Sequence, residues 1–88
     1  MITAVVLISA EKGALPTLGE ELAAIPGVSE VYSVTGDFDF IAMVRVRQHE
    51  ELADIVTGRI AQTSGVARTR THVAFRTHSK HDLETLFG

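Results

Sequence analysis

A short polar segment, Val34-Thr35-Gly36-Asp37-Phe38-Asp39, carries the residues of this chain best suited to bind a small charged molecule. Gly36 tolerates the positive φ of a sharp turn, and exposed backbone N–H groups at such a turn can hold a carboxylate. Residues two apart in extended chain point the same way, so Asp37 and Asp39 are expected to face one site and hold an ammonium group. The segment therefore predicts a binding loop for a zwitterion, although the same residues also suit an ordinary hairpin turn.

No group of residues in the sequence indicates catalysis. None of the serines lies in a nucleophile-elbow motif, and the glycines form no phosphate-binding pattern. His78 and His81, with Asp82 as a third ligand, come nearest to a metal site, but solvated histidines are the simpler interpretation. We therefore expect no catalytic residue, no metal and no cofactor.

Composition limits the chain to one small domain, spanning residues 1–88, in which 45% of residues are hydrophobic. Because so short a chain has a thin core, we interpret part of this apolar content as surface for a partner. The sequence has no cysteine, which agrees with a cytoplasmic location, and no apolar run reaches the ~20 residues of a membrane span. The net charge of −3 argues against direct binding to DNA.

Hydrophobic periodicity predicts the elements that position the loop. Strands are expected over residues 3–9, 28–35, 38–47 and 66–79, the first of them central in the sheet and the last long enough to bend. Two helices are expected from apolar stripes of three- and four-residue spacing: Leu15, Leu18, Leu22 and Ile25, then Leu52, Ile55, Val56 and Ile60. A further short helical turn is expected to begin within residues 79–82.

The predicted order of elements indicates an α+β fold of the ferredoxin-like βαββαβ type, with four antiparallel strands and both helices on one face. The covered face is expected to carry Phe40, Ala42, Val44, Val46, Val73 and Phe75. The open face is expected to carry Ile41, Met43, Ala74, Asp39, Arg45, Arg70, His72 and Arg76.

Such a mixed apolar and charged face is seldom left bare on a soluble monomer. We therefore expect a second copy to pack against it face to face. Asp39 and Arg45 would then pair with Arg70 or His72 of the same or the facing chain. Solvated strand residues are the alternative, because exposed ion pairs contribute little.

Several of these residues together resemble a known family. They are Pro26-Gly27-Val28 with Val31, the segment Val34 to Asp39, Leu52 and Ile60, and the run Gly65-Val66-Ala67-Arg68-Thr69-Arg70-Thr71. Over essentially its whole length the chain resembles the effector domain of the leucine-responsive/asparagine regulator (Lrp/AsnC) family, the regulation-of-amino-acid-metabolism domain. The helix-turn-helix of full-length members is missing, so the chain looks like the stand-alone form.

The resemblance implies a dimeric α+β barrel that assembles further, into octamers or decamers, and binds an amino-acid effector near the hairpin loop. By resemblance, Thr35, Gly36, Asp37, Phe38 and Asp39 supply the effector contacts, and Thr69 and Thr71 lie on the strand nearby. The implied function is effector binding linked to transcriptional regulation of amino-acid metabolism, with the chain itself and a full-length regulator as protein partners, and with neither DNA nor membrane.

Three alternatives remain open at this point. The first is a small monooxygenase or isomerase of the dimeric α+β barrel type, with His72 and Tyr32 as candidate groups near a substrate. The second is an ACT-type amino-acid domain, although the expected glycine-rich turn after the first strand is represented only by Gly13. The third is an assembly adaptor for a full-length regulator.

Overall fold

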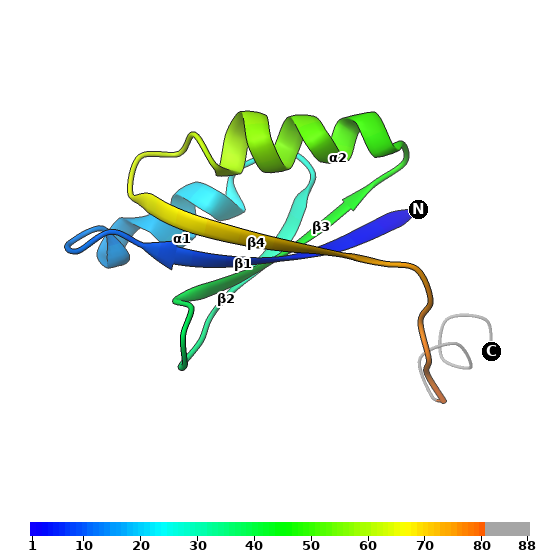
Figure 1. Cartoon of the computed structure of the whole chain (residues 1–88), viewed down its shortest axis with the longest axis horizontal. Coiled ribbons are helices and arrows are strands. Elements are labelled where there is room, and N and C mark those ends of the chain that lie inside the picture. Colours follow the sequence, from blue (N-terminus) through cyan, green and yellow to red (C-terminus); the bar gives the residue numbers. More distant parts are fainter. Residues whose placement is uncertain (81–88) are drawn as a thin grey trace.

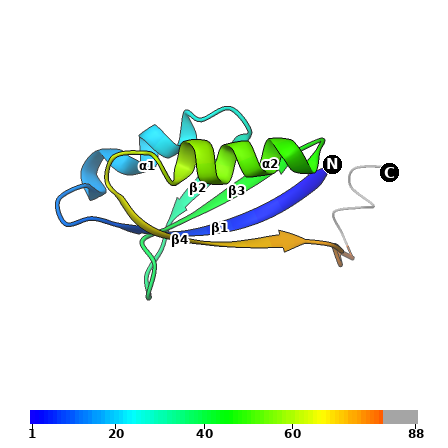
Figure 2. The same ribbon diagram turned by 45° about the horizontal axis from the view of Figure 1, so that its top comes forward.

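The computed structural model of the chain describes residues 1–80. Its elements follow the predicted order: β1 (Ile2–Ala10), α1 (Leu15–Ala23), β2 (Val28–Ser33), β3 (Phe40–Val46), α2 (His49–Ile55) with its π-helical continuation η1 (Val56–Ile60), and β4 (Val66–Ala74). The strands form one antiparallel sheet in the order β2-β3-β1-β4, so β1 is central, as predicted. Both helices lie on one face of the sheet (Figure 1 and Figure 2), which confirms the ferredoxin-like α+β fold.

Strict alternation along the two inner strands builds the core. Every second side chain of β1 and β3 points toward the helices and is buried: Ala4, Val6, Ile8, Phe40, Ala42, Val44 and Val46. The helices cover them with Leu18, Leu22, Leu52, Ile55, Val56 and Ile60. Within residues 1–80 no polar or charged residue is buried, so the core is held by apolar packing.

The remaining side chains of β1 and β3 face away from the helices. Val5 pairs with Met43, and Leu7 pairs with Ile41, so these four side chains lie together in the middle of the open face. All four are half-buried in the single chain, because no helix covers them. The alternation therefore separates a closed core from an apolar strip that is still accessible.

The last strand differs from its prediction. It ends at Ala74 and not at residue 79, and Val73 and Phe75, expected in the core, are 47% and 94% exposed. Register explains both results, because β4 is an edge strand whose last pairing is Ala74 with Thr3, near the start of β1. The pairing of β4 with β1 ends at that pair, so no strand pairing holds Phe75. The helical turn expected to begin within residues 79–82 lies largely outside the described residues.

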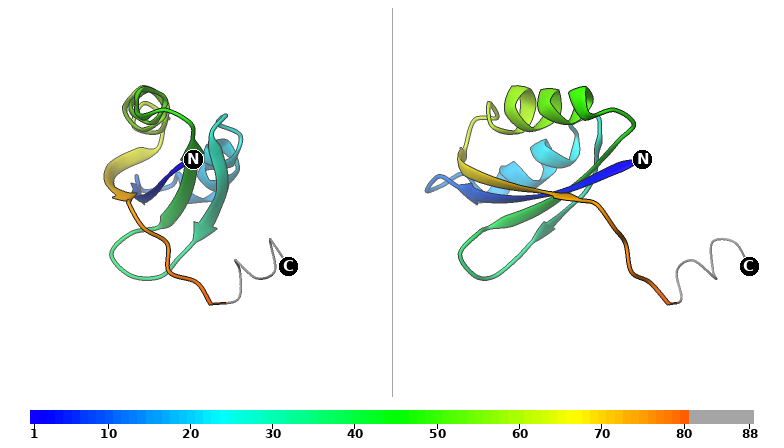
Figure 3. Two further views of the ribbon diagram at one scale, coloured as in Figure 1. Left: turned by 90° about the vertical axis from the view of Figure 1, so that its right-hand side faces the viewer. Right: turned by 45° about the vertical axis from the view of Figure 1, so that its right-hand side comes forward.

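The hairpin is also more open than the predicted tight turn at Gly36 and Asp37. Residues 34–39 form a loop that extends from the sheet away from the helices (Figure 3). Its base is closed by a hydrogen bond of 3.0 Å from the Val34 N–H to the Asp39 carbonyl oxygen. Gly36 has a φ of +112°, as its place at the loop's turn predicted. No helix among residues 1–80 has the length and apolar composition needed to cross a membrane.

Candidate ligand-binding site

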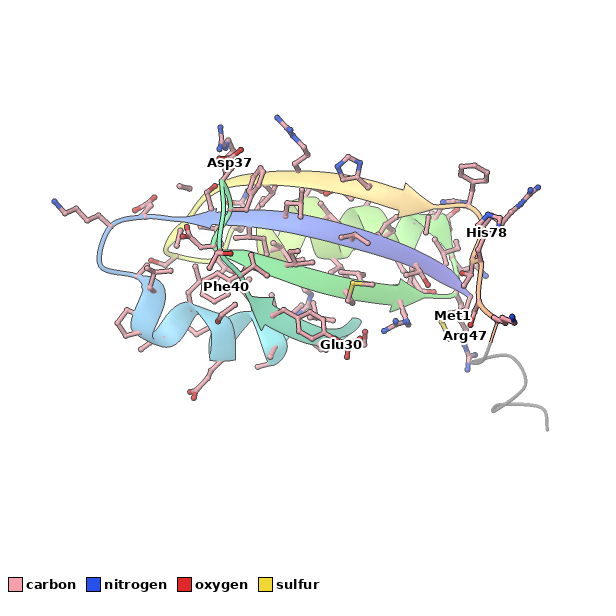
Figure 4. All side chains as sticks on the ribbon, turned by 90° about the horizontal axis from the view of Figure 1, so that it is seen from below. Met1, Glu30, Asp37, Phe40, Arg47 and His78 are labelled. Carbon is pink, nitrogen blue, oxygen red and sulfur yellow. The ribbon has the colours of Figure 1, made fainter. Side chains whose placement is uncertain are left out.

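An open pocket of about 700 Å³ lies where the 34–39 loop leaves the open face of the sheet. Its lining comes from β1, the end of β2, the loop and β3: Leu7, Ser33, Val34, Thr35, Asp37, Phe38 and Ile41. The size falls within the range typical of small-molecule sites, and the lining combines apolar walls with a few polar groups. Figure 4 views this face and shows the loop running from Phe40 at its base to Asp37 beside β4.

The sheet and the loop supply different parts of the pocket. Leu7 and Ile41 are cross-strand partners, so register brings their side chains to the same side and makes the apolar floor. Thr35 and Asp37 come from the loop and are exposed, so they place a hydroxyl and a carboxylate at the edge of the pocket. The arrangement can hold a molecule with an apolar part and a charged part.

Phe38 links the loop to the edge strand. The guanidinium carbons of Arg68 and Arg70 lie 5.2 Å and 5.7 Å from the centre of its ring. Arginine stacks well on aromatic rings, because the ring face carries a negative partial charge. These contacts join the loop to β4 and bring two positive charges next to Phe38, which lines the pocket.

Asp39 has a different position from Asp37. Its Oδ2 accepts a hydrogen bond of 2.7 Å from the Ala10 N–H, and its own N–H donates to the Ile8 carbonyl oxygen at 2.9 Å. Both contacts join the end of the loop to β1. The carboxylate is therefore engaged with backbone and does not line the pocket, in contrast to the expectation that both aspartates face one site.

The structure brings together some of the sequence-predicted site residues and separates others. Thr35, Asp37 and Phe38 line the pocket, and Gly36 turns the loop between them. Thr69 and Thr71 pair with Ile8 and Val6, two buried core residues, so they lie on the helix-covered side of β4 and outside this pocket.

Sequence reasoning missed Leu7 as a lining residue and the contact of the two arginines with Phe38. Leu7 carried a usable signal, because it alternates with Val6 and Ile8 in a strand whose other face is buried. The contact of the two arginines with Phe38 had no signal in the sequence, because it depends on the position of the loop relative to β4.

At the opposite edge of the open face Arg45 forms an ion pair with Glu30. The expected pairing within the chain, with Arg70 or His72, does not occur. The Arg45 guanidinium lies 3.2 Å from the Glu30 carboxylate and donates to the Ser29 hydroxyl at 2.5 Å. Glu30 was absent from the expected face, but its pairing opposite Met43 places it there. At about 40% exposure of each side chain the ion pair adds little stability.

Tyr32 provides a test of this edge. A hydrogen bond to Glu30 raises the pKa of the Tyr32 hydroxyl, and the same bond, followed by Arg45, lowers the pKa of the Glu30 carboxyl. The hydrogen bond from the Tyr32 hydroxyl to the Glu30 carboxylate therefore forms at pH values between the two pKa values. It is lost when the pH falls through the lowered pKa of Glu30, and also when it rises through the raised pKa of Tyr32.

We expect the Tyr32 hydroxyl to ionise at a higher pH than the hydroxyl of free tyrosine. The substitution Glu30→Gln should lower the pH midpoint of this ionisation. Tyr32 is the sole tyrosine of a chain without tryptophan, so ultraviolet difference absorbance reports it directly. Glu50→Gln, at an exposed position of α2, is the matched control and should leave the midpoint in place. An unchanged midpoint in Glu30→Gln would contradict the contact.

No group of three metal-ligating side chains occurs among residues 1–80. His78 lies within this range, whereas His81 and Asp82 lie outside the described residues. The candidate site thus rests on the loop pocket alone.

The chain thus combines a ferredoxin-like sheet with a candidate small-molecule pocket at one end of its open face. The chain belongs to the family of the Lrp/AsnC ligand binding domain, whose model matches residues 3–83. Membership places it with the ligand-binding domains of transcriptional regulators and not with the enzymes that share this fold. The enzyme alternative based on His72 and Tyr32 is thereby set aside.

Two curated relatives illustrate the family. The HTH-type transcriptional regulator FL11 of Pyrococcus horikoshii is 31% identical over 77 residues, which cover 88% of this chain and 50% of the relative. An uncharacterized HTH-type transcriptional regulator of the same organism, PH1916, is 40% identical over 60 residues, covering 68% of this chain and 40% of the relative. The chain thus spans about half or less of the length of these curated relatives.

Solved structures agree with this assignment. The crystal structure of TTHA0845 from Thermus thermophilus is 49% identical with a TM-score of 0.85, covering 91% of this chain and 100% of that one. The feast or famine regulatory protein Rv3291c from M. tuberculosis, complexed with L-methionine, is 29% identical with a TM-score of 0.76, covering 93% of this chain and 55% of that one. One structural relative is therefore known with a bound amino acid.

Proposed function

We propose that this domain is a cytoplasmic amino-acid sensor that binds its effector in the pocket beside the 34–39 loop and self-associates. Such a domain would serve transcriptional regulation of amino-acid metabolism. The observation that carries the proposal is the pocket itself, in which Thr35, Asp37 and Phe38 meet the apolar pair Leu7 and Ile41. The complex of the related Rv3291c with L-methionine supports the ligand class.

Each part of the pocket has a task in this proposal. Asp37 holds the ammonium group of the effector, and backbone N–H groups near Gly36 hold its carboxylate. Leu7 and Ile41 contact the side chain of the effector. Asp39 contributes by fixing the loop to Ala10 through its 2.7 Å hydrogen bond. Thr69 and Thr71, on the far side of β4, would reach an effector only in a neighbouring copy.

Asp37→Asn is expected to weaken effector binding roughly tenfold or more, because a hydrogen bond to a charged group contributes ~1.5–3 kcal/mol. A thermal-shift screen against the twenty amino acids identifies the effector first, since a ligand of the native state raises its stability. Calorimetry with that amino acid then compares the variant with the parent protein.

Asp54→Asn is the matched control, because Asp54 is also exposed but lies on α2, on the other face of the sheet. It should leave affinity unchanged. If Asp37→Asn folds normally and binds as tightly as the parent, the ammonium group is held elsewhere and the role of Asp37 is wrong.

Self-association is carried by a separate observation. Val5 and Met43 form an apolar pair on the open face beyond the pocket floor, and no helix of the same chain covers them. We propose that a second copy packs there and that such dimers assemble into octamers or decamers. A longer regulator of the same family is the second protein partner we propose, because the same fold would present the same face.

Light scattering tests the dimer directly. The expected result at micromolar concentration is a mass of at least two chains, and Met43→Glu should lower it, because a carboxylate would then be buried at the contact. Glu51→Gln, on the exposed side of α2, serves as the control. A monomer in the parent protein would overturn this part of the proposal.

A further inference from the structure

The tip of the 34–39 loop has few contacts that fix its position. The base is held by hydrogen bonds of Val34 and Asp39, which join these two residues to each other and to β1. Among residues 1–80, no hydrogen bond or ion pair involves residues 35–38. Thr35, Asp37 and Phe38 nevertheless line the pocket, so the shape of the pocket depends on where the tip lies.

Register places two arginines of β4 within reach of this tip. Arg68 pairs with Ser9, and Arg70 pairs with Leu7 of the pocket floor. Residues two apart in a strand point the same way, so both arginine side chains leave the same face of the sheet. Figure 4 shows Asp37, in the loop tip, beside β4 on this face.

The Phe38 ring joins the tip to these arginines. The guanidinium carbons lie 5.2 Å and 5.7 Å from the ring centre, within the ~6 Å over which a ring attracts a cation. At an exposed site each such contact shifts an equilibrium by about two- to fivefold. Two of them can therefore bias the position of a loop tip that makes no hydrogen bond. Neither arginine lines the pocket itself.

We propose that Arg68 and Arg70 are positioning residues that hold the loop tip where it forms the pocket. They bind the Phe38 ring, and the ring keeps Thr35 and Asp37 in place before a ligand arrives. Without this contact the tip leaves that position for part of the time. The affinity for the ligand then falls in proportion to the fraction of molecules in which the pocket is formed. This inference rests on the proposed function, because it concerns the same pocket.

NMR spectra test the contact without a ligand. The ring current of Phe38 should displace the Nε–H and δ-methylene resonances of Arg68 and Arg70 from the range of exposed arginines. Phe38→Leu should return them to that range. Arg59 is exposed on η1, on the helix-covered side, and serves as the internal control whose resonances stay in place. Resonances of Arg68 and Arg70 that do not respond to Phe38→Leu would overturn the contact.

Calorimetry tests whether the contact serves the site. The probe is the tightest-binding of the twenty amino acids in a thermal-shift screen, with L-methionine tested first. Arg68→Gln/Arg70→Gln should weaken its binding by about three- to tenfold. The matched control, Arg59→Gln, should leave the affinity unchanged. Thermal denaturation shows that each variant is folded, and the exposure of both arginines predicts little change in Tm.

A double-mutant cycle separates positioning from direct attraction between the arginines and the ligand. In the Phe38→Leu background the ring is gone, so removing both arginines should cause no further loss of affinity. Direct attraction would instead give the same loss with and without the ring. Arg68→Lys/Arg70→Lys keeps both charges but loses the planar groups that stack on the ring, so it should bind with intermediate affinity.

The proposed function and the positioning role fail in different ways. Unchanged affinity in the glutamine double variant overturns the positioning role while the proposed function stands. An equal loss of affinity in the parent and Phe38→Leu backgrounds has the same meaning. If no amino acid binds the parent protein, the proposed function is wrong and the positioning role fails with it.

Discussion

Leu22→Ala is expected to lower the free energy of unfolding by about 2–5 kcal/mol, the largest effect of any single truncation considered for this domain. Leu22 lies on α1, is fully buried, and belongs to the core cluster over the sheet. Removing its side chain leaves a cavity that close-packed neighbours fill only in part. Because small domains lose ~4–8 °C in Tm per kcal/mol, the Tm should fall by roughly 8–40 °C.

Thermal and urea denaturation followed by circular dichroism measure this change. Both proteins are compared at one chain concentration, because self-association would make the Tm depend on it. The neighbouring Glu21→Ala is the matched control, since Glu21 is exposed on the same helix. A Leu22→Ala protein as stable as the control would mean that α1 does not pack as described.

Gly27→Ala is the second change with a large expected effect. Gly27 lies between α1 and β2 with a φ of +97°, and a Cβ built there would overlap the Cδ1 atom of Ile55. An L-residue in this conformation costs about 1–2 kcal/mol, and displacing a packed core side chain adds about 1–3 kcal/mol. The free energy of unfolding should therefore fall by ~2–5 kcal/mol.

Gly58→Ala separates this effect from the general loss of a glycine. Gly58 lies in η1, its φ is not positive, and a Cβ there would meet no atom within 4 Å. Alanine at such a helical position should stabilise by about 0.5–1 kcal/mol. Equal destabilisation at both positions in urea unfolding would show that the space around Gly27 is not the cause.

The α+β fold was predictable because its signals are local. The apolar run of residues 3–9, the alternation in residues 38–47 and the stripes through Leu18, Leu22, Leu52 and Ile60 supply most of the residues that form the core. Gly27 and Gly65, which follow the two helical segments in the sequence, both have a positive φ. The chemistry of the loop was visible in the same way, because Thr35, Asp37 and Phe38 lie within four consecutive residues of the sequence.

The errors arose where neighbours distant in sequence decide the outcome. Phe75 alternates like a core residue, but β4 lies at the edge and has no partner beyond Ala74, so the ring is exposed. Arg45 forms its ion pair with Glu30 because the register of β2 and β3 places both side chains on one face of the sheet. Periodicity along a single strand carries no information about which strand is an edge or which charge lies across from it.

The sequence by itself determined the order of strands and helices, the buried faces of both helices and of residues 38–47, and that one glycine turn carries the polar groups of a candidate binding loop. Only the tertiary structure decided how those groups are used. The fold turned Asp39 toward the Ala10 N–H, left Asp37 at the pocket, and set Phe38 beneath Arg68 and Arg70. Residue type and spacing dictate local conformation, whereas the meeting of a loop with an edge strand far along the chain depends on strand order and register.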